Sequence, residues 1–479
     1  MKNRVKTPGI IALATGFLVA LLPPSLPNAT PRPVDSLLAR HAAALGGLER
    51  LLAARTRYTE SSLRMESTGL EGRVRTWSAL PCFSRTEIDL GLFSVRQGFD
   101  GERAWIVDQN GKVSFREDPA SVSDRETTCM LESWAYLLGD DAIEAEAAGP
   151  DTVGGVPCET VVLRPADGSP CRLLLSRKTF LPAATVVSSP AGEIRRLFGD
   201  WRSVEGIMVP FETVTEHTAI GQRLATRIDS IELDPPIDPA LFRPPPEDAR
   251  DYRFAGGAGA SIHFSYHLRH LYVPVQLPGV DGTRLFLLDS GAGMTVIDSV
   301  LAAEMALPEG GRISGIGAGG ATDFRMTRLP GLGVPGIDFE EQTVVVYPID
   351  RVVGSLTGQS IGGILGYDFL SRFAAVIDYG ERFIALSDPD SFAVPAGDTA
   401  VDAPLVNNIF SLPAVVDGEA TGRFLLDTGA NTTTLRPGFL EEHGLLAGRR
   451  RARISITGAG GASDAFLVRL RSMEIGGHT

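Results

Sequence analysis

The strongest constraint on this chain is a short segment that occurs twice. Residues 286–292 read Phe-Leu-Leu-Asp-Ser-Gly-Ala, and residues 424–430 read Phe-Leu-Leu-Asp-Thr-Gly-Ala. In both copies an apolar run leads to an Asp at the end of a predicted strand, and the Gly two positions later permits a tight turn at little steric cost. One Asp-Ser-Gly or Asp-Thr-Gly is an ordinary turn sequence, so the evidence lies in the repetition.

Both copies stand in a longer frame that also matches. The Gly-rich stretch at 313–324 (ISGIGAGGATDF) is echoed at 454–466 (ISITGAGGASDAF). Asp289 precedes Gly317 of the first stretch by 28 positions, and the second copy has a similar interval. Similarity over this length indicates one supersecondary unit used twice, so we expect two similar lobes that face each other.

Length and composition bound the class of protein. At 479 residues the chain has room for about three domains. Its 53 Gly and 32 Pro favour strands and turns over long helices. The net charge is −13 with Arg and Lys scattered, which argues against nucleic acid as a partner. The one dense basic run, at 449–453, is better explained as a solvated loop than as a polyanion site.

The N-terminus has the pattern of an export signal. Three basic residues within positions 2–6 precede an apolar run over 9–22, which is too short for a membrane span and suits the core of a signal peptide. Two prolines end the run, and small residues near Ala29 offer a cleavage site. We therefore predict removal of residues 1–29 and a periplasmic or secreted protein with no remaining membrane span. An uncleaved anchor is the less favoured alternative.

The four cysteines suit an oxidising compartment, because an even number in an exported chain favours disulfides. Cys158 and Cys171 flank a hairpin-like segment and are expected to pair, which leaves Cys82 with Cys129. Free buried thiols are the alternative. No CxxC pair or His cluster accompanies them, so we predict neither a metal site nor a cofactor.

Residues 34–243 read as an antiparallel β domain with helices at 34–55, interrupted at two glycines, and at 124–139. This block resembles the periplasmic lipoprotein-carrier type of fold, a curved antiparallel sheet that holds helices in its concave side. The resemblance implies acyl chains or a lipoprotein as ligands. Tryptophans are candidates for a lipid pocket, although such aromatics are more often core; they are Trp77, Trp105, Trp134 and Trp201.

A Pro- and Gly-rich linker is expected over 244–261, followed by a first lobe over 262–388 and a second over 400–479. Past its Gly-rich stretch the first lobe continues into Ile364-Leu365-Gly366, for which the second lobe has no counterpart before Thr479. We expect the natural chain to continue, or a neighbouring chain to complete this lobe.

Over residues 262–479 the two Asp motifs and the Ile-Leu-Gly366 element together resemble the aspartic peptidases, specifically bacterial retropepsin-like proteins with two half-domains in one chain. The resemblance implies a mainly β (α+β) protein in which a pseudo-twofold acid protease domain follows the N-terminal sheet. It implies a catalytic dyad of Asp289 and Asp427 that hydrolyses a peptide or protein substrate. The alternative is a non-catalytic lipid- or lipoprotein-binding protein with degenerate peptidase-like lobes.

The chemistry of such a dyad follows from charge repulsion. Two adjacent carboxylates cannot both ionise cheaply, so they share one proton and titrate as a unit. The ionised member deprotonates a water while the protonated member polarises the scissile carbonyl. The resemblance assigns loop support to the residues around the dyad, through hydroxyl hydrogen bonds and close loop approach; they are Ser290, Gly291, Thr428, Gly429 and Gly366.

Two departures from the family pattern matter. Ala292 and Ala430 stand where pepsin-like lobes often carry Ser or Thr. Without these hydroxyls the dyad lacks a hydrogen-bond donor that would stabilise its charged form. We therefore expect an activity optimum milder than that of pepsin, at roughly pH 5–7. The Gly-rich stretches stand where flap hairpins belong but contain no Tyr, and plain surface hairpins are the alternative. The flap candidates are Gly317, Gly319, Gly320, Gly458, Gly460 and Gly461.

The histidines suggest no other chemistry. His217 and the three between 263 and 270 form no triad with a nucleophilic Ser or Cys, so serine hydrolysis is a poor competitor. His263, His267 and His270 fall in a predicted extended stretch, where surface or linker positions are more common than metal ligands.

Overall fold

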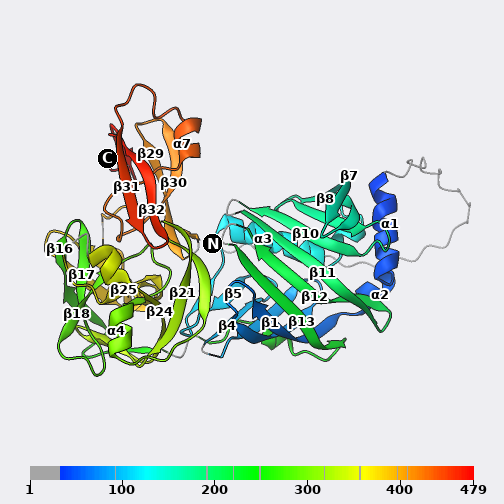
Figure 1. Cartoon of the computed structure of the whole chain (residues 1–479), viewed down its shortest axis with the longest axis horizontal. Coiled ribbons are helices and arrows are strands. Elements are labelled where there is room, and N and C mark those ends of the chain that lie inside the picture. Colours follow the sequence, from blue (N-terminus) through cyan, green and yellow to red (C-terminus); the bar gives the residue numbers. More distant parts are fainter. Residues whose placement is uncertain are drawn as a thin grey trace, which may run out of the picture.

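The computed structural model describes residues 33–479 except 92, 190–191, 219–220, 247–249, 318, 355–357, 396 and 407. The predicted signal peptide lies outside the described residues. The protein is mainly β, as predicted, with a broad N-terminal sheet beside two smaller lobes, the second (orange to red) above the first in Figure 1. None of the helices in the described part is long and apolar enough to cross a membrane.

The N-terminal domain is one thirteen-stranded antiparallel sheet with the order β6-β5-β4-β3-β2-β1-β13-β12-β11-β10-β9-β8-β7. Consecutive strands pair as hairpins within β1–β6 and within β7–β13, and β1 pairs with β13. The strands are β1 (Thr56–Met65), β2 (Glu71–Ala79), β3 (Phe83–Asp89), β4 (Ser94–Phe99), β5 (Ala104–Val107), β6 (Val113–Phe115), β7 (Ile143–Val153), β8 (Val156–Pro165), β9 (Cys171–Ser176), β10 (Pro182–Ser189), β11 (Gly192–Val204), β12 (Ile207–His217) and β13 (Gln222–Leu233).

Helices pack against this sheet and bury apolar side chains from both elements. The helices are α1 (Pro33–Leu45), α2 (Leu48–Ala53), α3 (Pro119–Glu132) and the 3-10 helix η1 (Ala135–Leu137). The predicted break between α1 and α2 falls at Gly46, whose φ of 116° favours glycine. The third helix starts earlier than expected because Asp118 caps it, accepting a hydrogen bond from Ser121 N at 3.0 Å. It ends before Trp134, whose left-handed φ of 62° separates it from η1.

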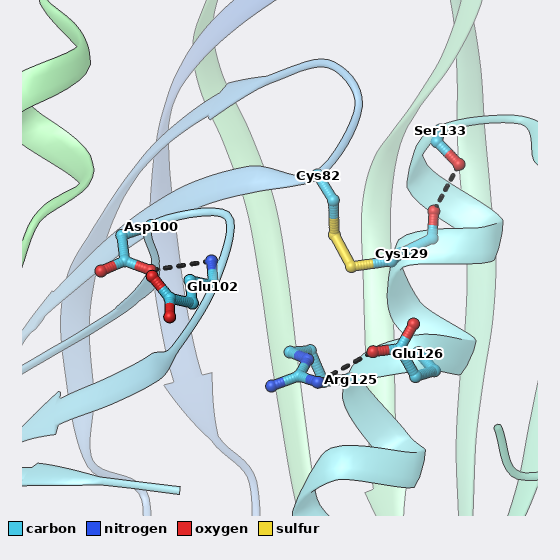
Figure 2. Close-up of a disulfide and its surroundings, with 7 residues drawn as sticks. All are labelled: Cys82, Asp100, Glu102, Arg125, Glu126, Cys129 and Ser133. Carbon is cyan, nitrogen blue, oxygen red and sulfur yellow. Dashed lines mark hydrogen bonds and ion pairs between the residues drawn. A yellow bond between two sulfur atoms is a disulfide. The ribbon is translucent and has the colours of Figure 1, made fainter. Parts of the chain in front are cut away.

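Figure 2 shows the disulfide between Cys82, in the β2–β3 turn, and Cys129 on α3. The expected Cys158–Cys171 pair is wrong, because both thiols are free and buried. In the β8–β9 ladder Cys171 lies opposite Leu163, five positions beyond Cys158. Side chains alternate between faces along a strand, so the two cysteines point to opposite faces of the sheet.

Thiol titration checks this arrangement. Burial raises the pKa of the Cys171 thiol to about 11, which makes it a poor nucleophile. We expect the native protein to react slowly with a thiol reagent and the unfolded, unreduced protein to expose only Cys158 and Cys171. Replacing Cys82 with Ser should add one thiol, from Cys129, and lower stability by about 2–4 kcal/mol. Fast labelling of the native wild type, or no thiols after unfolding, would contradict the assignment.

The first lobe is built on an eleven-stranded sheet with the order β14-β23-β22-β17-β18-β25-β19-β24-β21-β20 and β16 beside β17, plus a small sheet β15-β27-β26. Its elements are β14 (Tyr252–Phe254), β15 (Gly259–His263), β16 (Ser265–His267), β17 (His270–Gln276), β18 (Thr283–Leu288), β19 (Val296–Asp298), α4 (Ser299–Glu304), β20 (Arg312–Gly317), β21 (Gly320–Leu329), β22 (Leu332–Val334), β23 (Ile337–Phe339), β24 (Gln342–Tyr347), β25 (Gly363–Leu365), α6 (Tyr367–Leu370), β26 (Ala374–Asp378) and β27 (Phe383–Ser387). Fully buried Leu271, Phe286 and Leu365 centre its core.

Part of the predicted linker belongs to this lobe. Strands β14 and β15 lie within 244–261 or extend just past it, and they pair with β23 and β27. Asp251 in the same segment forms an ion pair with Arg372, whose side chain is 3% exposed. The segment is therefore fixed to the lobe by both backbone and side chains.

The second lobe repeats the central hairpin of the first. Its elements are β28 (Leu405–Val406), β29 (Ile409–Val416), β30 (Ala420–Leu425), α7 (Pro437–Glu442), β31 (Ala452–Gly458), β32 (Gly461–Leu467) and β33 (Met473–Glu474). In the first lobe β25 covers Leu287 and Leu288, which are 2% and 0% exposed, whereas the equivalent Leu425 and Leu426 are 48% and 44% exposed. The loop that follows β30 and carries Asp427 is thus more open to solvent than the loop that follows β18 and carries Asp289.

Turns of the N-terminal domain contact the first lobe. The side chain of Asn110, between β5 and β6, accepts from Thr343 N at 2.7 Å and donates to Thr343 O at 3.2 Å. The hydroxyls of Ser67, after β1, and Ser314, on β20, lie 3.3 Å apart. The Asn110 amide bonds both the backbone N–H and the backbone C=O of Thr343, as a neighbouring strand would. Asn110 therefore attaches the N-terminal domain to β24.

Candidate active site

Asp289 follows the last residue of β18 and is held there by hydrogen bonds to the neighbouring strand β25 and to its own turn. Its backbone N donates to Leu365 O at 3.0 Å, so the parallel partner β25 carries the pairing one residue past the strand. Its Oδ1 accepts from Gly291 N at 2.8 Å and from Ala292 N at 3.1 Å. These amides close the turn around the carboxyl group, which is half-buried.

Asp427 occupies the same position after β30. Leu426 N donates to Phe410 O at 2.8 Å, and Asp427 Oδ1 accepts from Gly429 N at 2.8 Å. The local fold is the same because the same apolar-Asp-hydroxyl-Gly order produces the same turn. The environment differs, since Asp427 is exposed.

Ser290 and Thr428 lock the two loops together by four reciprocal hydrogen bonds. Ser290 N donates to Thr428 Oγ1 and Thr428 N donates to Ser290 Oγ, both at 3.0 Å. Each hydroxyl also donates across the interface, Ser290 Oγ to Leu426 O at 2.8 Å and Thr428 Oγ1 to Leu288 O at 2.9 Å. Each hydroxyl therefore donates one hydrogen bond to the opposite lobe and accepts one from it. These bonds fix the position of one loop relative to the other.

The two glycines place each carboxyl against the opposite loop. A Cβ added to Gly291 would lie 2.5 Å from Asp427 Cγ, and one added to Gly429 would lie 2.3 Å from Asp289 Cγ. The two carboxyl groups therefore lie next to each other. Burial, together with the neighbouring Asp427 carboxylate, raises the pKa of Asp289 to about 7. At neutral pH and below, this arrangement can hold one proton between two acids.

Gly366 packs against the backbone of the loop that carries Asp289. A Cβ at Gly366 would lie 2.6 Å from Met294 O and 2.8 Å from Ala292 O, so the backbones can approach only because the residue is glycine. The following residue, Tyr367, donates its N–H to Ala292 O at 2.7 Å. Buried Asp368 then accepts from both N and Oγ1 of Thr295, which ties the short helix α6 to the same loop.

The Gly-rich stretches form hairpins whose tips meet. Gly319 N donates to Ala459 O at 2.8 Å, and a Cβ at Gly319 would lie 2.3 Å from Gly461 N. In Figure 1 the β31–β32 hairpin of the second lobe points down toward the first lobe. All flap candidates lie at the tips of the β20–β21 and β31–β32 hairpins: Gly317, Gly319, Gly320, Gly458, Gly460 and Gly461.

A tyrosine outside the two flap hairpins contacts their tips. Tyr347, the last residue of β24, accepts a hydrogen bond from Gly460 N at 3.2 Å on its hydroxyl and packs its ring against Phe324. Tyr347 was not among the predicted flap residues, because it lies outside the Gly-rich stretches. No local pattern identifies Tyr347, because its proximity to the second flap arises only from the packing of two lobes.

The histidines lie in the extended segments expected for them, and the described residues contain no group of side chains arranged to hold a metal. His263 and His267 are exposed. His270 is not a surface or linker residue, however, because its side chain is 7% exposed and faces the second catalytic-type loop.

The N-terminal domain has two cavities next to its disulfide. The larger, about 210 Å³, has apolar walls from Phe99 and Trp105 and charged walls from Arg116 and Arg125, the last of which is drawn in Figure 2. The smaller, about 60 Å³, includes Trp134 in its lining. Trp105 and Trp134 thus each border one of these cavities.

Comparison with known proteins finds a family match in the C-terminal region and distant likenesses to solved structures. The aspartyl protease family matches residues 273–369 and 412–479, and this region resembles that family. A DUF1329 family protein from Desulfovibrio piger is 13% identical, with a TM-score of 0.33, over 44% of this chain and 98% of its own. A LolA superfamily protein from Nitrosomonas europaea is 10% identical with the same coverage and TM-score. No curated protein matches the chain.

Proposed function

We propose that the two lobes form an exported aspartic endopeptidase that hydrolyses peptide bonds with a water activated by Asp289 and Asp427. The reciprocal bonding of Ser290 and Thr428 carries this proposal, because it presses each carboxyl onto the glycine of the opposite loop. Nothing in an ordinary pair of turns requires four hydrogen bonds between two lobes. A shared water site between two acids does require it.

The asymmetry of the pair assigns the two roles. We assign the shared proton to Asp289, whose pKa burial and the neighbouring Asp427 carboxylate raise to about 7, and the role of base to Asp427. Asp427 takes a proton from water as the oxygen attacks the scissile carbonyl carbon, while Asp289 gives its proton to the carbonyl oxygen. In the second step Asp427 protonates the leaving nitrogen, the C–N bond breaks, and Asp289 recovers a proton from a hydroxyl of the tetrahedral intermediate.

The flap tips supply the lid for this reaction. Because Gly319 and Ala459 bond each other directly, the hairpins must separate before an extended substrate can reach the acids. Their glycines allow close contact in the closed state and impose little resistance to opening. The substrate is therefore an extended peptide or an unfolded protein segment.

Export fits the remaining features. The N-terminal segment has the pattern of a signal peptide, and a disulfide joins Cys82 to Cys129. We place the mature protein in the periplasm or outside the cell, with residues 34–243 as an accessory domain to the peptidase.

Lipid or lipoprotein binding is the second candidate. The cavity beside Trp105 and Phe99 favours it, since an acyl chain needs an apolar wall. At about 210 Å³ the cavity is smaller than the roughly 300–1,000 Å³ typical of ligand sites, and two arginines line it. These features rank the carrier function below the peptidase.

The test is cleavage of an unfolded protein by the purified full chain. We expect new peptide termini that carry one ¹⁸O when the reaction is run in labelled water, and complete inhibition by pepstatin but not by serine- or metal-directed inhibitors. Acyl chains that copurify with the protein, combined with no cleavage over the acid to neutral range, would favour the carrier instead.

A further inference from the structure

The two flap hairpins are attached to the protein in different ways. The first, β20–β21, belongs to the eleven-stranded sheet, because β21 pairs with β24 along residues 325–329. Three of its side chains, Met326, Thr327 and Leu329, are at most 2% exposed. Among the described residues the second, β31–β32, forms a two-stranded sheet by itself, and each residue of it whose burial is described is half-buried or exposed. The first hairpin is thus anchored in a buried sheet, whereas the second is not anchored in this way.

The β1–β2 turn of the N-terminal domain lies against the first arm of the first flap. In Figure 1 β21 lies on the side of the first lobe that faces the N-terminal domain. The Leu70 side chain fills the space beside Gly311, where an added Cβ would lie 2.3 Å from Leu70 Cδ1. Ser314 Oγ donates to Asp323 Oδ1 at 2.8 Å, so the Ser67 hydroxyl, 3.3 Å from Ser314 Oγ, is the donor to it. This chain of hydrogen bonds joins the N-terminal domain to both arms of the flap.

The β1–β2 turn is itself held in place by the N-terminal sheet. Met65 N donates to Leu70 O at 2.8 Å, and Gly69 N donates to Met65 O at 2.8 Å, which closes the turn. Glu66 N donates to Arg223 O at 2.9 Å on the neighbouring strand β13. Because the turn is bonded to its sheet in this way, Leu70 presents a fixed surface to the flap.

The β3–β4 turn adds an apolar contact. Phe93 packs against a buried cluster that contains Met326 of β21. Ile313 of β20 and Phe324 of β21 border the same cluster. Leu90 N donates to Phe93 O at 3.0 Å and closes this turn. The β1–β2, β3–β4 and β5–β6 turns of the N-terminal domain thus contact the first flap or the strand that pairs with it.

We propose that the N-terminal domain fixes the first flap, with Leu70 and Phe93 as positioning residues, and that substrate enters by movement of the β31–β32 flap alone. The proposal rests on the peptidase function and adds the side from which the site opens. The closed tips bond each other, since Gly319 N donates to Ala459 O at 2.8 Å, so one hairpin must move away before a substrate can enter. The hairpin with fewer buried contacts opens at the lower cost in free energy.

Amide hydrogen exchange of the full chain, without substrate, tests this asymmetry. Both hairpins are antiparallel pairs with similar tips, so a difference in exchange reports how readily each one opens. We expect the amides of β20–β21 to exchange at least about 10-fold more slowly than those of β31–β32.

Two alanine variants test the positioning residues. Leu70→Ala and Phe93→Ala should each raise exchange in β20–β21 by at least about 5-fold and lower kcat by about 10-fold. Leu70→Met conserves volume and should behave as wild type. The matched control is Leu138→Ala, at a position of the same domain that is 54% exposed, which should change neither quantity.

A reversible disulfide tests the same point in the active protein. In the Ser67→Cys/Ser314→Cys variant, oxidation would tie the first flap to the N-terminal domain at a place where the two hydroxyls already lie 3.3 Å apart. We expect the oxidised form to keep at least about half of the activity of the reduced form on an extended peptide. Wild type treated with the same oxidant and reductant is the control, because its Cys82–Cys129 bond meets the same reagents.

A loss of activity of about 10-fold or more on oxidation, restored by reductant, would overturn the proposal, because the first flap would then have to leave the domain. Equal exchange in the two hairpins, or no effect of Leu70→Ala and Phe93→Ala on exchange in β20–β21, would also overturn it. If the wild type cleaves no peptide, the proposed function fails, while the exchange comparison still decides which flap moves. Should a variant not fold or the disulfide not form, slower exchange of β31–β32 than of β20–β21 in the wild type refutes the proposal, and the reverse order supports it.

Discussion

Replacing Asp289 or Asp427 with Asn is expected to lower kcat for peptide hydrolysis by at least about 10³-fold. Either change removes one partner of the shared proton, so the remaining acid has no complementary group. The four hydrogen bonds of Ser290 and Thr428 involve only hydroxyl and backbone groups, so they should form in both variants. Initial rates on a quenched fluorescent peptide, with pepstatin-inhibited wild type as the baseline, measure the effect.

The same variants give a stability readout that separates lost catalysis from lost folding. The folded-state pKa of Asp289, about 7, lies above the unfolded value near 3.9, so the folded state binds more protons in this window and loses stability as the pH rises through it. Asp289→Asn removes that penalty and should stabilise the protein by about 1–3 kcal/mol at pH 8, with no gain at pH 4. Asp402→Asn, at an exposed position, is the control. An active or strongly destabilised Asp289→Asn variant would contradict the dyad.

Adding one methyl group at Gly291 or Gly429 is expected to lower kcat by about 100-fold or more. The new Cβ would lie 2.5 Å from Asp427 Cγ or 2.3 Å from Asp289 Cγ, where no side chain fits, so the loops must separate. Separation lengthens the bonds between Ser290 and Thr428 and costs about 1–3 kcal/mol of stability. Kinetics and thermal unfolding of the two alanine variants measure both effects.

Gly293 provides a matched control in the same turn, because a Cβ there meets nothing within 4 Å. Neither Gly291 nor Gly293 has a left-handed φ, so the comparison isolates the steric effect from backbone strain. Gly293→Ala should keep wild-type activity and stability. Equal losses in Gly291→Ala and Gly293→Ala would show that the loops tolerate no change at all, and the argument from close approach would fail.

The repeat was sufficient to predict the centre of the site. The apolar-Asp-hydroxyl-Gly order specifies a strand and its turn locally, so two copies in one frame predicted two facing loops. Gly366 was assigned from the family resemblance, and in the structure its backbone lies against Met294 and Ala292 of the first loop. These predictions depend on sequence-local geometry, which is the part of a fold that a sequence expresses most directly.

What depends on packing between distant segments could not be predicted. Spacing suggested a Cys158–Cys171 bond, but strand register places the two on opposite faces. The contact of Tyr347 with Gly460 joins two lobes and has no local pattern. His270 was assigned to a surface or linker position because a His in an extended stretch is usually exposed, but in the structure it is 7% exposed.

The two acids also differ in how far they are exposed. In the first lobe β25 covers the strand that carries Asp289, whereas Leu426, next to Asp427, is 44% exposed. A half-buried acid beside an exposed one is a physical basis for a stable division of roles, because desolvation favours the proton on Asp289.

The central claim, that one proton shared by two acids activates the water, is tested most directly by the dependence of kcat/KM on pH for the wild-type chain. From about pH 4 to about pH 9 we predict a bell whose maximum lies at roughly pH 5–7 and whose alkaline limb falls near pH 7, as Asp289 loses its proton. Activity that keeps rising to about pH 9 would mean that the protonated acid is not needed, and the account of the site would be wrong.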